Sequence, residues 1–198
     1  FIIFLAVATI RGVTVSITEA RRLPDGAEVA GFVVLGYVNS AEAASPVFGQ
    51  RMEEQLSRRG IEDPQQGEWY PARPVQTAFA ETADGVGEQL LVNAGKEIAS
   101  LYDWPADVDT LDAALSAMDD AHSDAHRRIG SHDIGGYEVV SREDRSARVV
   151  SDGFPYPTEV ARGAIEGTVE RFKTTAGMVT VADVSADSDY EIVFDASW

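Results

Sequence analysis

The last third of the chain changes from helical to alternating hydrophobic periodicity near Gly135, and this change restricts the fold more than any other feature. The segments with the short apolar pattern of β-strands are residues 137–141, 147–151, 178–184 and 190–194. Residues 158–175 separate the second segment from the third and carry apolar side chains at helical spacing. Two hairpins joined by one helix typically form a four-stranded antiparallel sheet with the helix across one face. The pattern therefore predicts a ββαββ unit over residues 133–198.

The preceding part of the chain has a mainly helical pattern. Helices are predicted for about residues 46–60, 74–83, 86–101 and 109–129. Residues 28–38 are almost entirely apolar and contain two glycines, and we favour a strand over a helix for them. Residues 61–71 are predicted to be a loop. These predictions give an α+β fold, in which an N-terminal helical layer packs on the C-terminal four-stranded sheet.

The predicted organisation is an N-terminal strand extension over residues 1–27, followed by a single α+β domain over residues 28–198. Within this domain, residues 28–132 are mainly helical and residues 133–198 form the ββαββ unit. The apolar segment Phe1–Ile10 is too short to cross a membrane, which takes about twenty residues. We expect this segment to pair as a buried strand, within one subunit or with a second one.

The net charge of the chain indicates which classes of molecule it can bind. There are 33 acidic and 16 basic residues, which give a formal net charge of −17, and the only lysines are Lys96 and Lys173. Such a composition is typical of proteins from salt-loving organisms, although an acidic protein from an ordinary cytoplasm is the alternative. It argues against a nucleic-acid partner, because phosphate binding needs a basic surface. The absence of cysteine excludes disulfides and thiolate metal sites, and we expect a cytoplasmic protein.

Several short motifs resemble a known superfamily. They are "GEWYP" at 67–71, "LLVNAGKEIA" at 90–99, "DIGGYEV" at 133–139, "GFPYP" at 153–157, and a helix containing Gly163 and Gly167. Together they resemble the small-molecule sensor superfamily that groups 4-vinyl-reductase-type domains with haem–nitric-oxide-binding proteins and related domains without haem. The resemblance covers about residues 28–198. It implies an α+β ligand-binding domain that is often regulatory and often dimeric, so we expect a homodimer.

The same resemblance bears on the cofactor. Haem-binding members carry a Tyr-x-Ser-x-Arg signature and a histidine below the iron, whereas the nearest string here, Tyr137 to Arg142, has the wrong spacing. His122 and His126 are the residues that could reach an iron. Zinc-binding members use cysteines, which this chain lacks. The interpretation is a domain of the haem-less branch that holds no cofactor.

All three histidines lie within residues 119–133, and this permits two interpretations. On a helix, Asp119, His122 and His126 are spaced by three and four residues, and His132 could fold back toward them. Imidazole and carboxylate ligands suit a divalent metal, which would make the chain a metal-dependent enzyme or a metal-binding protein. The favoured alternative is a helix end, with His122 at the edge of the core and His126 near the helix C-terminus.

No catalytic motif is present in the sequence, so a non-catalytic sensor or small-molecule-binding module is the favoured function. The ligand would be small and apolar and would lie between the helical layer and the sheet, with His122 fixing its orientation. The expected lining is Trp69, Tyr70, Leu91, Met118, His122, Phe154, Tyr156 and Phe172. The alternative is that these same side chains simply fill a core. Neither a nucleic acid nor a membrane is expected as a partner.

Overall fold

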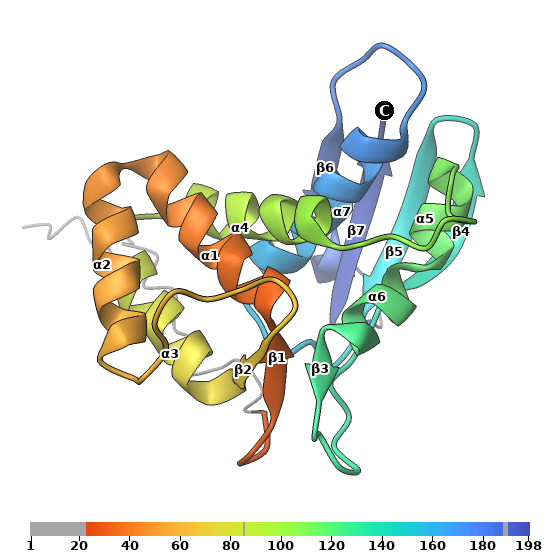
Figure 1. Ribbon diagram of the computed structural model, residues 1–198. Coiled ribbons are helices and arrows are strands. Elements are labelled where there is room, and N and C mark those ends of the chain that lie inside the picture. The colour runs from red at the N-terminus through yellow and green to blue at the C-terminus, as the bar shows by residue number, and fades with distance from the viewer. Residues whose placement is uncertain (1–22, 85, 188–189) are drawn as a thin grey trace, which may run out of the picture.

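The computed structural model describes residues 23–84, 86–187 and 190–198. The strand predicted for Phe1–Ile10 lies outside these residues. Figure 1 shows helices α1, α2 and α3 on one side and the larger sheet on the other, with α4 running between them. Within the described ranges, no helix is long and apolar enough to span a membrane.

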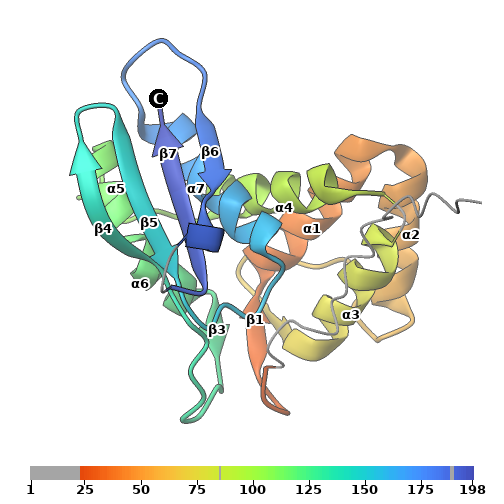
Figure 2. The ribbon, with the colours of Figure 1, turned by 180° about the vertical axis from the view of Figure 1, so that it is seen from behind.

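The C-terminal ββαββ unit is confirmed. Its strands are β4 (Glu138–Glu143), β5 (Ser146–Ser151), β6 (Thr180–Asp183) and β7 (Ile192–Ser197). They form an antiparallel sheet of order β4-β5-β7-β6, and α7 (Thr158–Phe172) connects the two hairpins. The view from behind shows this sheet beside α7 (Figure 2).

The alternation of side chains along β5 and β7 gives this sheet one buried and one polar face. Val149 is opposite Phe194 on the buried face, and both side chains are inaccessible to solvent. One residue before Val149, Arg148 is opposite Asp195 on the exposed face, and its guanidinium donates to both carboxylate oxygens at 2.7 and 2.8 Å. Because side chains alternate with period two, Ala147 and Ala196 share the core face with Val149 and Phe194. Val150 and Val193 lie on the face of Arg148 and are buried there, so the polar part of that face is at Arg148 and Asp195.

The helical layer contains α1 (Gly31–Ala44), α2 (Pro46–Ser57), α3 (Ala72–Ala83) and α4 (Glu88–Leu101). Ser45 caps α2, because its Oγ accepts from the backbone N–H of Phe48 at 3.3 Å. Proline follows at the first helical position, as the sequence predicts.

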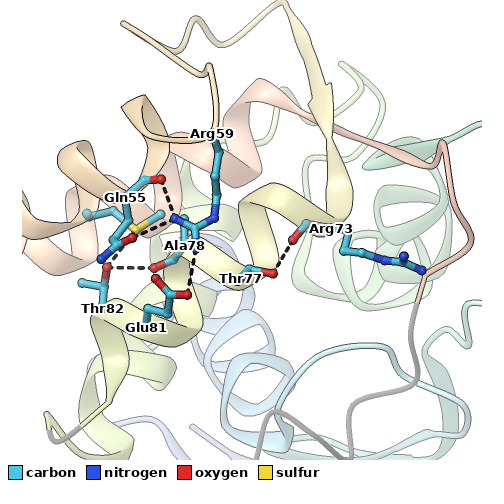
Figure 3. A network of polar contacts seen from close by, with 8 residues as sticks. Gln55, Arg59, Arg73, Thr77, Ala78, Glu81 and Thr82 are labelled. Carbon is cyan, nitrogen blue, oxygen red and sulfur yellow. Dashed lines mark hydrogen bonds and ion pairs between the residues drawn. The ribbon is translucent and has the colours of Figure 1, made fainter.

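Polar contacts hold α2 against α3 (Figure 3). Arg59 follows α2; its guanidinium donates to both the backbone carbonyl and the side chain of Gln55, and to Glu81 of α3 at 2.8 Å. Nearby, Thr82 donates to the carbonyl of Ala78 at 2.8 Å in the buried space between the helices. The two helices are thus fixed to each other on the side of the layer remote from the sheet.

Three secondary-structure predictions are wrong in the N-terminal part. Two of them concern residues 28–38 and 61–71, and the third concerns residues 109–129. Only residues 28–30 of the predicted strand 28–38 are extended, as β1 (Glu28–Ala30), and the rest is helix α1. The loop predicted for 61–71 ends in a strand, β2 (Trp69–Pro71). A segment buried on most sides has no polar face, and therefore its periodicity does not separate helix from strand.

The helix predicted for 109–129 is interrupted. It consists of α5 (Leu111–Ser116) and α6 (Met118–Asp124), and strand β3 (His126–Arg127) follows. A second sheet of order β2-β1-β3 results, because β1 pairs with both other strands. These pairings join residues far apart in sequence, so local patterns do not report them.

Helices α4 and α7 approach each other closely through glycines. A Cβ on Gly95 would lie 2.1 Å from the carbonyl oxygen of Val160, and a Cβ on Gly163 would lie 2.0 Å from that of Val92. Both distances are much shorter than a van der Waals contact. The clashing atoms belong to the backbone, so they cannot move away by a side-chain rotation. The small residues therefore set the separation between the helical layer and the sheet-covering helix.

We expect Gly163→Ala to lower the free energy of unfolding by at least about 2 kcal/mol, because α4 and α7 must separate to admit the methyl group. The gain in helix propensity of about 1 kcal/mol is too small to offset this. Urea denaturation measures the change, with Gly67→Ala as the control, since no atom lies within 4 Å of a Cβ there. Equal stability of the two variants would contradict the close contact.

Candidate ligand-binding cavity

A cavity of about 70 Å³ lies among helices α1, α4, α6 and α7. Most of its wall is apolar or aromatic. The lining is Phe32, Val33, Tyr37, Ile98, Ala99, Tyr102, Trp104, Met118, Ala121, His122, Ala125, His126, Tyr137, Phe154, Tyr156, Val160, Ala164 and Thr168. A cavity of about 150 Å³ is known to admit benzene, and one water takes about 30 Å³ of liquid. The space therefore suits a molecule of only a few heavy atoms.

Half-buried aromatic side chains line one end of the cavity. The ring of Tyr102 lies 5.5 Å from that of Phe32 and 5.0 Å from that of Trp104. The Tyr102 hydroxyl donates to the carboxylate of Asp124 at 2.8 Å, just after His122 on α6. The indole N–H of Trp104 donates to the carbonyl of Ala99 at 3.0 Å. These bonds fix the aromatic side chains between the cavity and solvent.

Two buried histidines form the other end, and each is only 7% exposed. His126 Nδ1 lies 2.8 Å from the carbonyl oxygen of His122, which can only accept, so this nitrogen carries the proton. His126 Nε2 then accepts from the Tyr156 hydroxyl at 2.5 Å. His122 Nε2 donates to the carbonyl of Ile134 at 3.0 Å. The hydrogen bonds thus assign one neutral tautomer to each ring.

The burial of this end keeps its groups uncharged. Desolvation lowers the pKa of His126 to about 4, and the neighbouring His122 acts in the same direction. Desolvation also lowers the pKa of His122, against the opposing effect of its bond to Ile134. The pKa values of Tyr37, Tyr137 and Tyr156 are raised by burial. At pH 7 the histidines are neutral and the tyrosines are protonated.

Four of the eight residues predicted to line a ligand site share the wall of this cavity. They are Met118, His122, Phe154 and Tyr156. Their rings are in contact: Phe154 lies 4.9 Å from His122 and 5.4 Å from Tyr156. Whether they bind a ligand remains a prediction.

The other four predicted residues lie elsewhere. Leu91 is fully buried core, and Phe172 packs edge-on against Trp104 at 5.2 Å. Strand β2 places Trp69 under the guanidinium of Arg127, 4.4 Å from the ring centroid, and the Tyr70 hydroxyl accepts from the backbone N–H of Gln65. Because β2 pairs with β1 in the smaller sheet, neither aromatic side chain reaches the cavity.

Sequence reasoning missed Tyr37 and Tyr137, which line the cavity. Tyr37 belongs to the apolar segment interpreted as a strand, where no pattern indicated which way it faces. Tyr137 begins the first predicted strand of the ββαββ unit, and it was considered only as the start of a string with the wrong spacing for the Tyr-x-Ser-x-Arg signature.

The proposed metal cluster is not assembled. Among the described residues, no three histidine or carboxylate side chains come together to hold an ion. Asp119 instead accepts from the backbone N–H of Tyr137 at 3.0 Å. His132 is exposed, and its Nδ1 lies 3.2 Å from the carbonyl oxygen of Ile129. The described residues therefore do not support a metal-dependent enzyme.

Comparison with solved structures identifies the fold. An oxygen-binding H-NOX domain related to soluble guanylate cyclases superposes with a TM-score of 0.58 and 17% identity, over 84% of this chain and 93% of that one. An H-NOX protein from K. algicida gives 0.55 and 14%, over 85% and 95%. A structure describing haem redox potential and porphyrin distortion gives 0.61 and 16%, over 85% and 99%. The chain has the H-NOX fold. No family model matches the sequence, and no curated protein matches it.

This likeness corrects our expectation about the cofactor. The missing Tyr-x-Ser-x-Arg signature led us to argue against haem and to expect no cofactor at all. That inference is wrong, because solved structures with this fold include ones whose descriptions name haem.

The described residues meet the needs of a haem only in part. A haem needs an axial ligand, and His122 and His126 place imidazoles on the cavity wall. Both nitrogens of His126 are engaged, however, and so is Nε2 of His122. The cavity volume is about 70 Å³, and no lysine or arginine is in its lining to pair with propionates. A porphyrin could enter only if the helical layer and α7 moved apart.

The buried His126 makes stability depend on pH. In the unfolded chain a histidine takes up a proton below about pH 6.5, whereas folded His126 does so only near pH 4. The contribution of His126 is therefore fully present above pH 6.5 and is lost as the pH falls toward 4, by at most about 3 kcal/mol.

We expect His126→Gln to show a smaller loss of unfolding free energy between pH 7 and 4.5 than the wild type in urea denaturation. His132→Gln, which removes the exposed histidine, is the control and should keep the wild-type difference. An unchanged pH dependence in His126→Gln would contradict a neutral, buried His126.

Proposed function

We propose that this domain is a non-catalytic sensor that binds a small, largely apolar molecule in the cavity described above. The observation that carries the proposal is the position of the cavity. Its wall is shared by α1 and α4 of the helical layer, by α6, and by α7, which covers the sheet. A ligand there would contact both layers at once and would favour whichever relative position gives the better contacts. Such a change is what a sensor transmits.

The chemistry of the wall supports binding rather than catalysis. No carboxylate, lysine or arginine is part of the lining. His126 is the best placed base, but its pKa of about 4 and its bond to Tyr156 make it a weak proton acceptor at pH 7. The fold supports the same function by analogy, because solved structures with this fold include an oxygen-binding domain.

A haem-dependent version of this sensor is the second candidate. The fold and the two imidazoles on the cavity wall favour it. If haem is held, His122 is the residue best placed to approach the iron, because its Nδ1 makes no hydrogen bond within the described part of the chain. The haem would supply the site for a gaseous ligand, and the cavity would have to open to admit it.

Three finer features belong to the proposal as well. We propose a homodimer, a cytoplasmic location and a salt-rich environment for this domain. The resemblance to sensor domains supports the first feature. The lack of cysteine supports the second, and the net charge of −17 with two lysines supports the third.

Native mass spectrometry of protein purified from its own source tests the proposal. We expect a small-molecule adduct on the wild type and none on Ala121→Leu, because Ala121 lines the cavity and the larger side chain fills it. Ala106→Leu is the matched control, since Ala106 is exposed on a loop, and it should keep the adduct.

Three results are decisive in that experiment. A haem mass accompanied by a Soret band would select the second candidate. A wild-type chain that carries no adduct would contradict ligand binding. An adduct that persists in Ala121→Leu would place the ligand outside the cavity.

A further inference from the structure

Four tyrosines from separate parts of the chain line the cavity: Tyr37 on α1, Tyr102 just after α4, Tyr137 just before β4 and Tyr156 just before α7. The hydroxyl of Tyr102 donates to Asp124. The hydroxyl of Tyr156 is engaged with His126. The hydroxyls of Tyr37 and Tyr137 have no hydrogen-bond partner among the described residues, and neither is sealed in close packing. They are unpaired donors at a mostly apolar cavity, whose wall also carries the unprotonated Nδ1 of His122.

Packing holds both of these rings in place. Tyr37 stacks on Phe79 with ring centroids 4.0 Å apart, and only 1% of its surface is exposed. Tyr137 lies 5.4 Å from Phe154 and 5.8 Å from His122. Tyr37 therefore cannot turn its hydroxyl to solvent, whereas Tyr137 is half-buried and is held by its ring contacts. A buried hydroxyl without a partner costs about 1–3 kcal/mol, so the arrangement favours a ligand that supplies an acceptor.

The charge of the site selects among acceptors. Burial raises the pKa of Tyr37 and Tyr137 and keeps both protonated, and both side chains line the same cavity. No cationic side chain lines the cavity to compensate an anion, and the protein as a whole carries a charge of −17. An anionic ligand would lose its hydration without a counter-charge. A hydrocarbon would leave both donors unpaired. A neutral oxygen acceptor avoids both costs.

We propose that the cavity binds a small neutral molecule with an apolar body and one accepting oxygen, such as a ketone, aldehyde or ether of a few carbons, and that Tyr37 and Tyr137 donate to this oxygen. A carbonyl oxygen has two lone pairs and can accept from both hydroxyls. The aromatic and aliphatic wall then covers the carbon atoms. This inference deepens the proposed function and rests on it.

A matched pair of probes tests it. Acetone and isobutene have nearly the same shape, but only acetone carries an acceptor in place of a methylene group. The two dissociation constants are measured by NMR from the ring signals of ¹³C-labelled tyrosine. The quantity compared between variants is the dissociation constant of isobutene divided by that of acetone. The free energy of removing each probe from water is the same for every variant, so it does not affect this comparison.

We expect this ratio to fall about tenfold in the double variant Tyr37→Phe/Tyr137→Phe, and about threefold in each single variant, as the loss of one or two hydrogen bonds of about 0.5–1.5 kcal/mol requires. Tyr70→Phe is the control, because its hydroxyl bonds Gln65 outside the cavity, and it should keep the wild-type ratio. Thermal denaturation confirms that each variant is folded.

Two results would overturn the inference, and only one of them would also overturn the proposed function. If both probes bind but the ratio is the same in all variants, the tyrosines do not select an acceptor and water satisfies them instead; the proposed function survives. If neither probe binds to the wild type or to any variant, the cavity is not a ligand site and the proposed function fails as well.

Discussion

The close contact between α4 and α7 determines the rest of the architecture. Gly95 and Gly163 bring the backbones of these helices together, so that neither position has room for a Cβ. The same helices supply one wall of the cavity, with Ile98 from α4 and Val160 from α7. The helical layer and the sheet are thereby held at one separation. A change in that separation would alter the cavity, and a ligand in the cavity would act on the separation.

The buried end of the cavity links elements that the chain order keeps apart. His126 lies between the carbonyl of His122 and the hydroxyl of Tyr156, 30 residues later. His122 in turn donates to the carbonyl of Ile134, just before β4. This chain of hydrogen bonds connects α6 to the start of α7 without any charged group. Because every member is neutral, the site can be buried without the cost of an unpaired charge.

The sequence predicts the C-terminal half well and the site only in part. Apolar and polar residues alternate along β5 and β7, and this alternation predicts strands. It arises because one face of the sheet is buried, whereas the other carries residues such as Arg148. The segment around Tyr37 is apolar on all sides, so its helix was mistaken for a strand. Trp69 is assigned to the smaller sheet by pairing with Ala30, a contact across 39 residues that no local pattern reports. Histidine spacing left a metal site open beside the favoured helix end, and neither interpretation indicated that the partner of His126 is a distant tyrosine.

The central claim is that the cavity between the two layers admits a ligand. Crystallography under xenon pressure tests it most directly, because xenon enters small apolar cavities without needing hydrogen bonds. We expect a xenon atom in contact with Tyr37, His122 and Val160, with nearby side chains shifted little. Anomalous density that is absent there, or found only at the surface, would contradict the account.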